Sequence, residues 1–254
     1  MGGTAPELAQ LARDGNRLVI WIERRRLLFV HNPKCAGTSV HKALMAEFPD
    51  AKAFWGRRYE AARDSIRDLA HMTIADARSE LGLTAPFQSF GFVRDPYGRF
   101  VSSYRHLKHW IRGFAQLTPE ELLFDLLDEE RIRFDWKFIH FAPQYRFFYV
   151  AGERAVSHVY KVEDLPAAWS AASQVFGLKA ELPRENRLEG MGDTKLSERA
   201  IARINLLYAR DFRLFGYDTV AAQAGLGEGP EVYAKFQLLW PERRKLDLSD
   251  KTEI

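Results

Sequence analysis

One stretch of the sequence decides the fold: residues 27–39 read LLFVHNPKCAGTS. The apolar run over 27–31 has the length and composition of a buried strand. The small and polar residues over 32–37 predict a loop, and apolar residues then recur at helical spacing over 38–48. This stretch therefore predicts a strand, a loop and a helix in succession.

The loop and the start of the helix have the chemistry of an anion-binding site. Backbone N–H groups at a helix N-terminus carry partial positive charge, and Gly37 would let the backbone approach an anion closely. Thr38 and Ser39 add hydroxyl donors, and Lys34 adds a mobile positive charge. The alternative is an ordinary turn with a solvated lysine. Because the lysine precedes the glycine, the pattern differs from the nucleoside triphosphatase loop, in which lysine follows the last glycine.

A second segment repeats this organisation: residues 90–104 read FGFVRDPYGRFVSSY. A strand is predicted over 90–93, and it must end before the proline, which disfavours helical conformation in the preceding residue. A helix then follows. Arg94 and Ser102 could grip a second phosphate, because the arginine fork matches phosphate oxygens and a hydroxyl can complete the shell. The alternative for Arg94 is a surface ion pair with a carboxylate such as Asp95.

Further strands and helices alternate along the chain. The remaining predicted elements are a strand over 18–22 that forms a hairpin with the strand over 27–31, a helix from the Thr118 capping box to about Leu127, a strand over 157–161, a helix over 166–176 that ends at Gly177, and a longer helix with an apolar stripe over 201–212. Strands alternating with helices imply an α/β fold with a largely parallel sheet. We expect a single domain over 1–254, with its core over about 18–217 and a tail over 218–254.

Composition limits the classes of function. The 37 Lys and Arg residues against 34 Asp and Glu residues give a net charge of only +3, so we expect no nucleic-acid partner. The single cysteine, Cys35, excludes an internal disulfide and a multi-cysteine metal site, and it is interpreted as a packing residue rather than a nucleophile. Since no apolar stretch approaches the roughly 18 residues that span a bilayer, we expect a soluble chain without a membrane span.

The segments FVHNPKCAGTS and FVRDPYGRFVSSY resemble the two cofactor loops of the carbohydrate sulfotransferases that use 3′-phosphoadenosine 5′-phosphosulfate (PAPS). The resemblance is closest to the branch that includes heparan sulfate 2-O-sulfotransferase, and weaker similarity continues through FAPQYRFF, VYKVEDLPAAW and YARDFRLFGYD. It implies a three-layer fold like that of P-loop nucleoside triphosphatases, with a mainly parallel central sheet flanked by helices. The donor-binding residues that it implies are Lys34, Cys35, Ala36, Gly37, Thr38 and Ser39 for the 5′-phosphosulfate, and Arg94 and Ser102 for the 3′-phosphate.

The resemblance also implies a reaction, which is in-line transfer of a sulfuryl group to a hydroxyl of a carbohydrate or glycoconjugate. Lys34 would stabilise the transferring group, and the single negative charge of that group leads us to expect no metal. His71 matches the second histidine of the His-Gly-His element in the 2-O-sulfotransferases, whereas Leu69 stands at the first position. His71 is thus the candidate general base. The alternatives are a structural role for His71, with Glu60 or Asp64 as the base.

Two groups of basic residues could contact an acceptor. The first group is Arg57, Arg58, Arg63 and Arg67, with Trp55 and Tyr59 interleaved. The second group is Arg105, His106, Lys108, His109 and Arg112. The alternative in each case is a solvated helix face. Aromatic side chains could stack on sugar rings, and the basic groups would suit an acidic or sulfated glycan.

Two other functions stay open: a nucleotide-binding or glycan-binding module without turnover, and a P-loop kinase that requires Mg²⁺ and ATP. The lack of a predicted membrane anchor leads us to expect a bacterial cytoplasmic enzyme that acts on a small glycan, a glycolipid precursor or another metabolite. The oligomeric state is not predicted.

Overall fold

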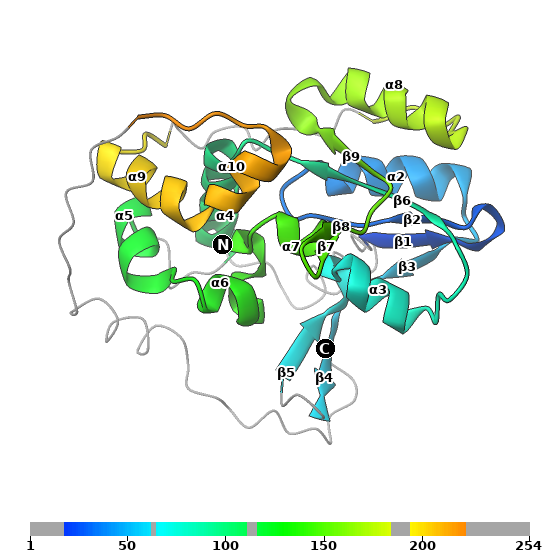
Figure 1. Cartoon of the computed structure of the whole chain (residues 1–254), viewed down its shortest axis with the longest axis horizontal. Coiled ribbons are helices and arrows are strands. Elements are labelled where there is room, and N and C mark those ends of the chain that lie inside the picture. Colours follow the sequence, from blue (N-terminus) through cyan, green and yellow to red (C-terminus); the bar gives the residue numbers. More distant parts are fainter. Residues whose placement is uncertain (1–17, 62–64, 111–115, 184–193, 222–254) are drawn as a thin grey trace, which may run out of the picture. The chain divides into compact units, whose positions relative to one another are not determined.

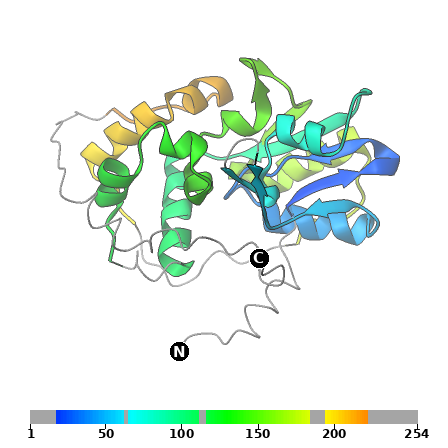
Figure 2. The ribbon, with the colours of Figure 1, turned by 90° about the horizontal axis from the view of Figure 1, so that it is seen from below.

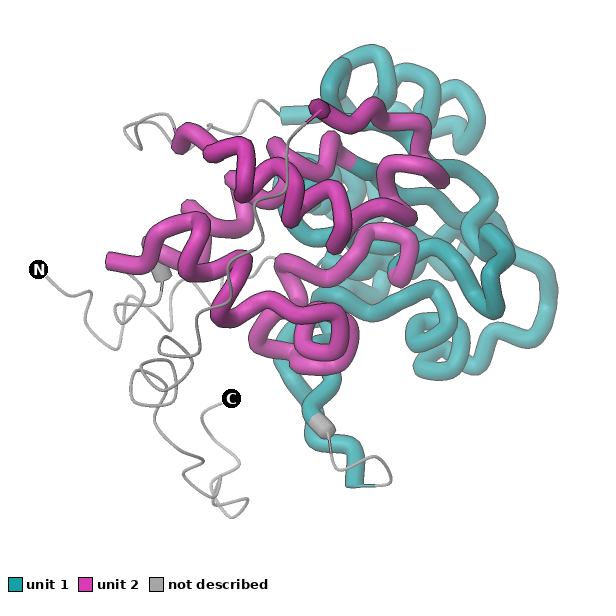
Figure 3. The backbone as a smooth tube through the Cα atoms, turned by 60° about the vertical axis from the view of Figure 1, so that its left-hand side comes forward, with its two compact units in different colours: residues 1–93, 147–186 teal, residues 94–146, 187–254 magenta. Residues whose placement is uncertain are grey.

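A computed structural model describes residues 18–61, 65–110, 116–183 and 194–221. The chain divides into two compact units (Figure 3), one formed by residues 1–93 and 147–186 and the other by residues 94–146 and 187–254. The predicted single domain stays a prediction, and most of the expected tail, residues 222–254, lies outside the described residues.

A five-stranded sheet forms the centre of the first unit (Figure 1). Its strands, in spatial order, are β3 (Lys52–Phe54), β1 (Val19–Ile22), β2 (Leu27–Phe29), β6 (Gln88–Val93) and β9 (His158–Lys161). Strands β2, β6 and β9 pair in parallel, whereas β1 is antiparallel to both β2 and β3. Because β3 opposes β1, it runs in the direction of β2, so all strands except β1 share one direction. The predicted α/β class with a mainly parallel sheet is confirmed.

Strands β1 and β2 form the predicted hairpin, with Ile20 opposite Phe29 and Ile22 opposite Leu27. A 3₁₀ turn, η1 (Glu23–Arg25), joins the two strands. Strand β2 ends at Phe29, two residues earlier than the apolar run predicts.

Alternate residues of the strands point to opposite faces of the sheet. One face packs against α2 (Gly37–Glu47) and α8 (Leu165–Phe176). On the other face, the ring of Phe148 lies against Gly91, where a Cβ atom would come within 2.4 Å of the ring. Figure 2 shows α3 (Ile74–Glu80) on the opposite side of the sheet from α2. Helices therefore cover both faces, which is the predicted three-layer arrangement.

The smaller elements of the first unit are two further antiparallel strand pairs and two short 3₁₀ turns, of which η3 contains His71. Their bounds are β4 (Arg57–Glu60), β5 (Ser65–Asp68), η3 (Leu69–His71), β7 (Tyr149–Val150), β8 (Glu153–Arg154) and η7 (Val162–Asp164). Helix α7 (Tyr145–Phe148) lies where the chain passes from the second unit to the first.

The described part of the second unit is helical. Its elements are α4 (Pro96–Trp110), α5 (Pro119–Glu121), the π-helical turn η5 (Leu122–Leu126), α6 (Arg131–Phe134), η6 (Trp136–Phe141), α9 (Glu198–Leu207) and α10 (Ala209–Phe215). The capping box predicted at Thr118 and Glu121 is confirmed, because each of the two residues accepts the backbone N–H of the other through its side chain.

The single long helix predicted over 201–212 is wrong, because Tyr208 leaves helical geometry and separates α9 from α10. The interruption coincides with the buried Tyr208 hydroxyl, which donates to the Phe141 carbonyl at 2.8 Å. No helix among the described residues is long and apolar enough to cross a membrane.

Candidate active site

The loop between β2 and α2 has a backbone shape suited to an anion. Lys34 and Ala36 adopt left-handed conformations with φ of 66° and 60°. Such conformations cost a non-glycine residue about 1–3 kcal/mol each and persist where the surrounding structure enforces them, often at functional sites. Left-handed residues in a loop can turn backbone N–H groups toward one anion. Helix α2 then begins at Gly37 without an acidic residue in its first turn, so its N-terminal dipole is not neutralised there.

Two buried side chains hold this loop. The Asn32 side-chain amide donates to the Phe92 carbonyl at 3.0 Å, and the same nitrogen lies 3.2 Å from Cys35 Sγ. Cys35 itself is buried in the apolar core beneath α2. The burial supports the interpretation of Cys35 as a packing residue, and the Asn32 contact ties the loop to the end of β6.

Gly37 is required because an imidazole occupies the space beside it. A Cβ atom at Gly37 would lie 2.0 Å from His31 Nε2 and 2.2 Å from His31 Cδ2. The His31 ring, which is only 4% exposed, therefore packs directly on the first residue of α2. The sequence predicts a role for Gly37 in backbone approach to an anion, and the structure adds a steric role toward His31.

The predicted base, His71, lies in the turn η3 and is held by a carboxylate. Its Nδ1 lies 3.0 Å from Asp68 Oδ1, which also accepts the Ala70 N–H at 3.0 Å. Burial opposes the ionised form of Asp68, but its interactions with His71 and Arg57 hold the pKa of this carboxyl below its usual range. In the form that could act as a base, His71 would donate its Nδ1 proton to the ionised Asp68, which would leave the lone pair of the imidazole at Nε2.

His71 also lies beside the loop over residues 30–36, between β2 and α2, which we call the anion loop after its expected ligand. The ring centroids of His31 and His71 are 4.9 Å apart, and their planes are tilted by 42°. A continuous series of contacts thus runs from Asp68 through His71 and His31 to Gly37. The sequence predicts His71 as a site residue but misses Asp68 and His31. Asp68 could have been found from the sequence, because it lies only three residues before His71.

The loop after β6 places Arg94 over the start of α4, in the second unit. A Cβ atom at Gly98 would lie 3.3 Å from Arg94 Nε and 3.7 Å from Arg94 Nη2, so the guanidinium lies against the first turn of the helix. That turn has no acidic residue, and the Asp95 carboxylate accepts the Gly98 N–H at 2.7 Å. Ser102 is half-buried one turn further along α4. A guanidinium beside a helix N-terminus is a favourable place for an anion.

The segment that contains the first basic group is a β-hairpin, so the alternative of an exposed helix is wrong. Its strands β4 and β5 pair Arg57 with Asp68 and Tyr59 with Ile66 on one face. Trp55 and Tyr59 are about half exposed, at 48% and 46%.

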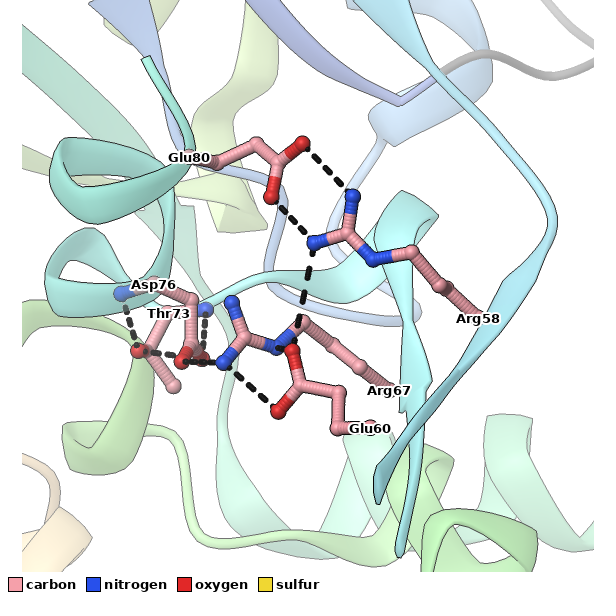
Figure 4. Close-up of polar contacts among 6 residues, drawn as sticks. All are labelled: Arg58, Glu60, Arg67, Thr73, Asp76 and Glu80. Carbon is pink, nitrogen blue, oxygen red and sulfur yellow. Dashed lines mark hydrogen bonds and ion pairs between the residues drawn. The ribbon is translucent and has the colours of Figure 1, made fainter. Parts of the chain in front are cut away.

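The opposite face of this hairpin carries an ion-pair network (Figure 4). Arg58 binds the Glu80 carboxylate through two hydrogen bonds, and this interaction lowers the pKa of Glu80. Arg67 binds Glu60 at 2.6 Å and 2.9 Å and reaches Asp76 at 3.5 Å. Both arginines therefore anchor the hairpin to α3, and Glu60, the substitute base, is engaged by Arg67.

Three residues of the second basic group, Arg105, His106 and Lys108, make contacts within the second unit. Arg105 Nε donates to Thr194 Oγ1 at 3.2 Å, Lys108 contacts the hydroxyl and ring of Tyr104, and the rings of His106 and His140 are 4.5 Å apart. Arg63, Asp64 and Arg112 lie outside the described residues. Binding of an acceptor by this group stays a prediction, as does the expected absence of a metal.

Comparison with known proteins identifies the family. The model of the sulfotransferase family matches residues 18–218, a range that contains both loops and the Asp68–His71 pair. Neither a curated protein nor a solved structure matches the chain. Because the family match extends over most of the sequence, this chain belongs to the sulfotransferase family of sulfuryl-transferring enzymes.

Proposed function

We propose that this sulfotransferase moves a sulfuryl group from PAPS to a hydroxyl of a carbohydrate or glycoconjugate. The observation that carries the proposal is the proximity of the anion loop to a histidine whose Nδ1 is held by a carboxylate. The resemblance of both loops to the branch that includes heparan sulfate 2-O-sulfotransferase supports PAPS as donor and a carbohydrate as acceptor. This arrangement combines a place for a transferring anion with a group able to deprotonate a hydroxyl.

The donor contacts follow from the two loops. The backbone of Lys34 through Gly37 and the hydroxyls of Thr38 and Ser39 would hold the 5′-phosphosulfate, and Arg94 and Ser102 would hold the 3′-phosphate. The first turn of α2 lacks acidic side chains, and each loop supplies a cation, which suits an anion. At α4 the Asp95 carboxylate already accepts the Gly98 N–H, so the Arg94 guanidinium would bind the 3′-phosphate there.

In the proposed reaction, His71 Nε2 removes the proton of the acceptor hydroxyl as its oxygen bonds to sulfur. The bond between sulfur and the oxygen of the 5′-phosphate breaks, and its electron pair leaves with adenosine 3′,5′-bisphosphate. Lys34 and the loop N–H groups stabilise the charge that develops on the leaving oxygen. Asp68 stabilises the imidazolium that His71 becomes, as a buried carboxylate does for the histidine of a hydrolase triad.

For the acceptor, we propose the hairpin face that carries Arg57 and Tyr59. Arg57 is exposed and pairs in register with Asp68, so this face continues to the residue that holds the base. Tyr59 and nearby Trp55 offer exposed aromatic surface of the kind that stacks on sugar rings.

Calorimetric binding of adenosine 3′,5′-bisphosphate and of 5′-AMP tests the donor site. The wild type should bind the bisphosphate more tightly, and Arg94→Ala should remove this preference. Arg94→Lys is the matched control, because it retains charge but loses the fork that binds phosphate in two places. Equal affinity of the wild type for both nucleotides would reject the PAPS site.

Sulfate transfer from labelled PAPS to a panel of sugars tests turnover. His71→Ala should retain the bisphosphate affinity and lose transfer. Binding without transfer in the wild type, across the whole panel, would favour the binding-module alternative. A requirement for Mg²⁺ and ATP would favour the kinase.

A further inference from the structure

The backbone of Arg94 is clamped by one buried side chain. The Gln144 side chain accepts the Arg94 N–H through Oε1 at 3.0 Å and donates from Nε2 to the Arg94 carbonyl at 2.8 Å. Gln144 has no exposed surface. A single side-chain amide thus satisfies both polar backbone groups of Arg94, directly after the end of β6. The orientation of the Arg94 peptide groups consequently depends on Gln144.

Gln144 is held in turn by a buried carboxylate. The Gln144 N–H donates to Asp211 Oδ2 at 2.7 Å, and the Tyr145 N–H donates to Asp211 Oδ1 at 2.9 Å. Asp211, on α10, also has no exposed surface. Since a carboxylate receives both N–H groups, the segment that carries Gln144 is fixed to α10 by charge-assisted hydrogen bonds.

These contacts bear on function because of the position of the Arg94 side chain. Its guanidinium lies over Gly98 in the first turn of α4. A guanidinium recognises phosphate through two parallel hydrogen bonds, which require the correct orientation as well as the correct charge. A shift of the Arg94 peptide groups would turn the fork away from that orientation and leave the charge in place.

We infer that Gln144, held by Asp211, is a positioning residue for Arg94 and thereby sets the preference of the protein for a nucleotide with a 3′-phosphate. The inference rests on the proposed function, in which Arg94 binds that phosphate. Gln144 touches neither nucleotide nor acceptor in this account and acts only through the backbone of Arg94.

The test uses the full-length protein and Gln144→Met, which approximates the size of glutamine without its amide. Affinities for adenosine 3′,5′-bisphosphate and for 5′-AMP are measured by calorimetry. We expect the bisphosphate to bind about 10-fold more weakly and 5′-AMP to bind as it does to the wild type. Ile132→Val, a buried substitution in the core of the same helical unit, is the control for general destabilisation and should keep the wild-type ratio of affinities.

A second variant, Gln144→Glu, keeps an acceptor for the Arg94 N–H and removes the donor to the Arg94 carbonyl. It should lower the ratio of affinities, and it provides the test if Gln144→Met does not fold. If either folded variant kept the wild-type ratio of bisphosphate affinity to 5′-AMP affinity, the inference about Gln144 would be wrong, whereas the proposed PAPS site would be unaffected. The absence of any preference in the wild type would instead reject the proposed function itself.

Discussion

The substitution Gly37→Ala tests the contact that joins the anion loop to the histidine pair. The new Cβ atom would lie 2.0 Å from His31 Nε2, whereas ordinary van der Waals contact begins at 3.4 Å. The His31 ring would therefore have to move by about 1.4 Å. Little room is available, because His31 is buried and the ring of His71 lies beside it.

Two effects of opposite sign decide the stability of this variant. Alanine favours a helix over glycine by up to about 1 kcal/mol, and by less at the first helical residue. Forcing an extra carbon into a packed site costs about 1–3 kcal/mol. We expect the overlap to dominate, so the free energy of unfolding should fall. Sulfate transfer should fall about 100-fold, since a displacement near 1 Å can cost that much when it moves a reacting group.

Urea unfolding and a transfer assay on the same preparations measure both effects. The cost of Gly37→Ala should disappear in a His31→Ala background, where the new methyl group has space, giving a coupling energy of at least about 1 kcal/mol. Gly98→Ala is the control for stability, since its Cβ atom would come no closer than 3.3 Å to its neighbours, the side chains of Arg94 and Asp95. A Gly37→Ala protein at least as stable as the wild type would refute the placement of His31.

Three further predictions concern carboxylates. Asp68→Asn should lower kcat at least about 100-fold and leave the bisphosphate affinity unchanged, because in the proposed mechanism Asp68 orients and stabilises His71 and does not contact the donor; an unchanged kcat would contradict this role. Burial raises the pKa of Asp211 from 3.8 to about 6, against the effect of Arg99. The native protein then holds a proton that the unfolded chain has released, so the free energy of unfolding should fall by on the order of 2 kcal/mol between pH 4 and pH 6.5 through this group. In Asp211→Asn, the free energy of unfolding measured in urea should not show this fall with pH. Parallel pH dependences of the wild type and the variant would contradict the raised pKa of Asp211. Glu80→Gln should cost less than about 1 kcal/mol in the same assay, since Arg58 is 47% exposed and its ion pair is screened by water; a larger loss would mean that this single pair holds the hairpin.

The local features of the fold could be predicted from the sequence. Apolar runs and helical spacing predict the two strand-loop-helix segments, and the capping box at Thr118 and the glycine end at Gly177 are confirmed. These features depend on residues at most four positions apart, whose hydrogen bonds and shared faces are determined by local geometry. The sequence also indicates where anions would bind, because the N-terminus of a helix attracts negative charge wherever the helix lies.

The hairpin over 57–68 escaped prediction for a physical reason. Its strands read RRYE and SIRD, so they carry mostly charged residues rather than a row of apolar ones, and the hairpin is held to α3 by Arg58 and Arg67. Hydrophobic periodicity is the main signal of secondary structure, and it is weak where ion pairs replace burial.

The tertiary structure alone brings together residues that are distant in the sequence. Packing of the sheet and its flanking turns places His31 against His71, and the path of the chain between β6 and α10 places Gln144 and Asp211 behind Arg94. Periodicity and motif spacing contain no information on such contacts, because they arise only when separate elements are buried against one another. The sequence by itself predicted the loop before α2 as an anion site and, through its resemblance to a family, His71 as the candidate base. Only the tertiary structure decided which groups contact His71 and the Arg94 backbone.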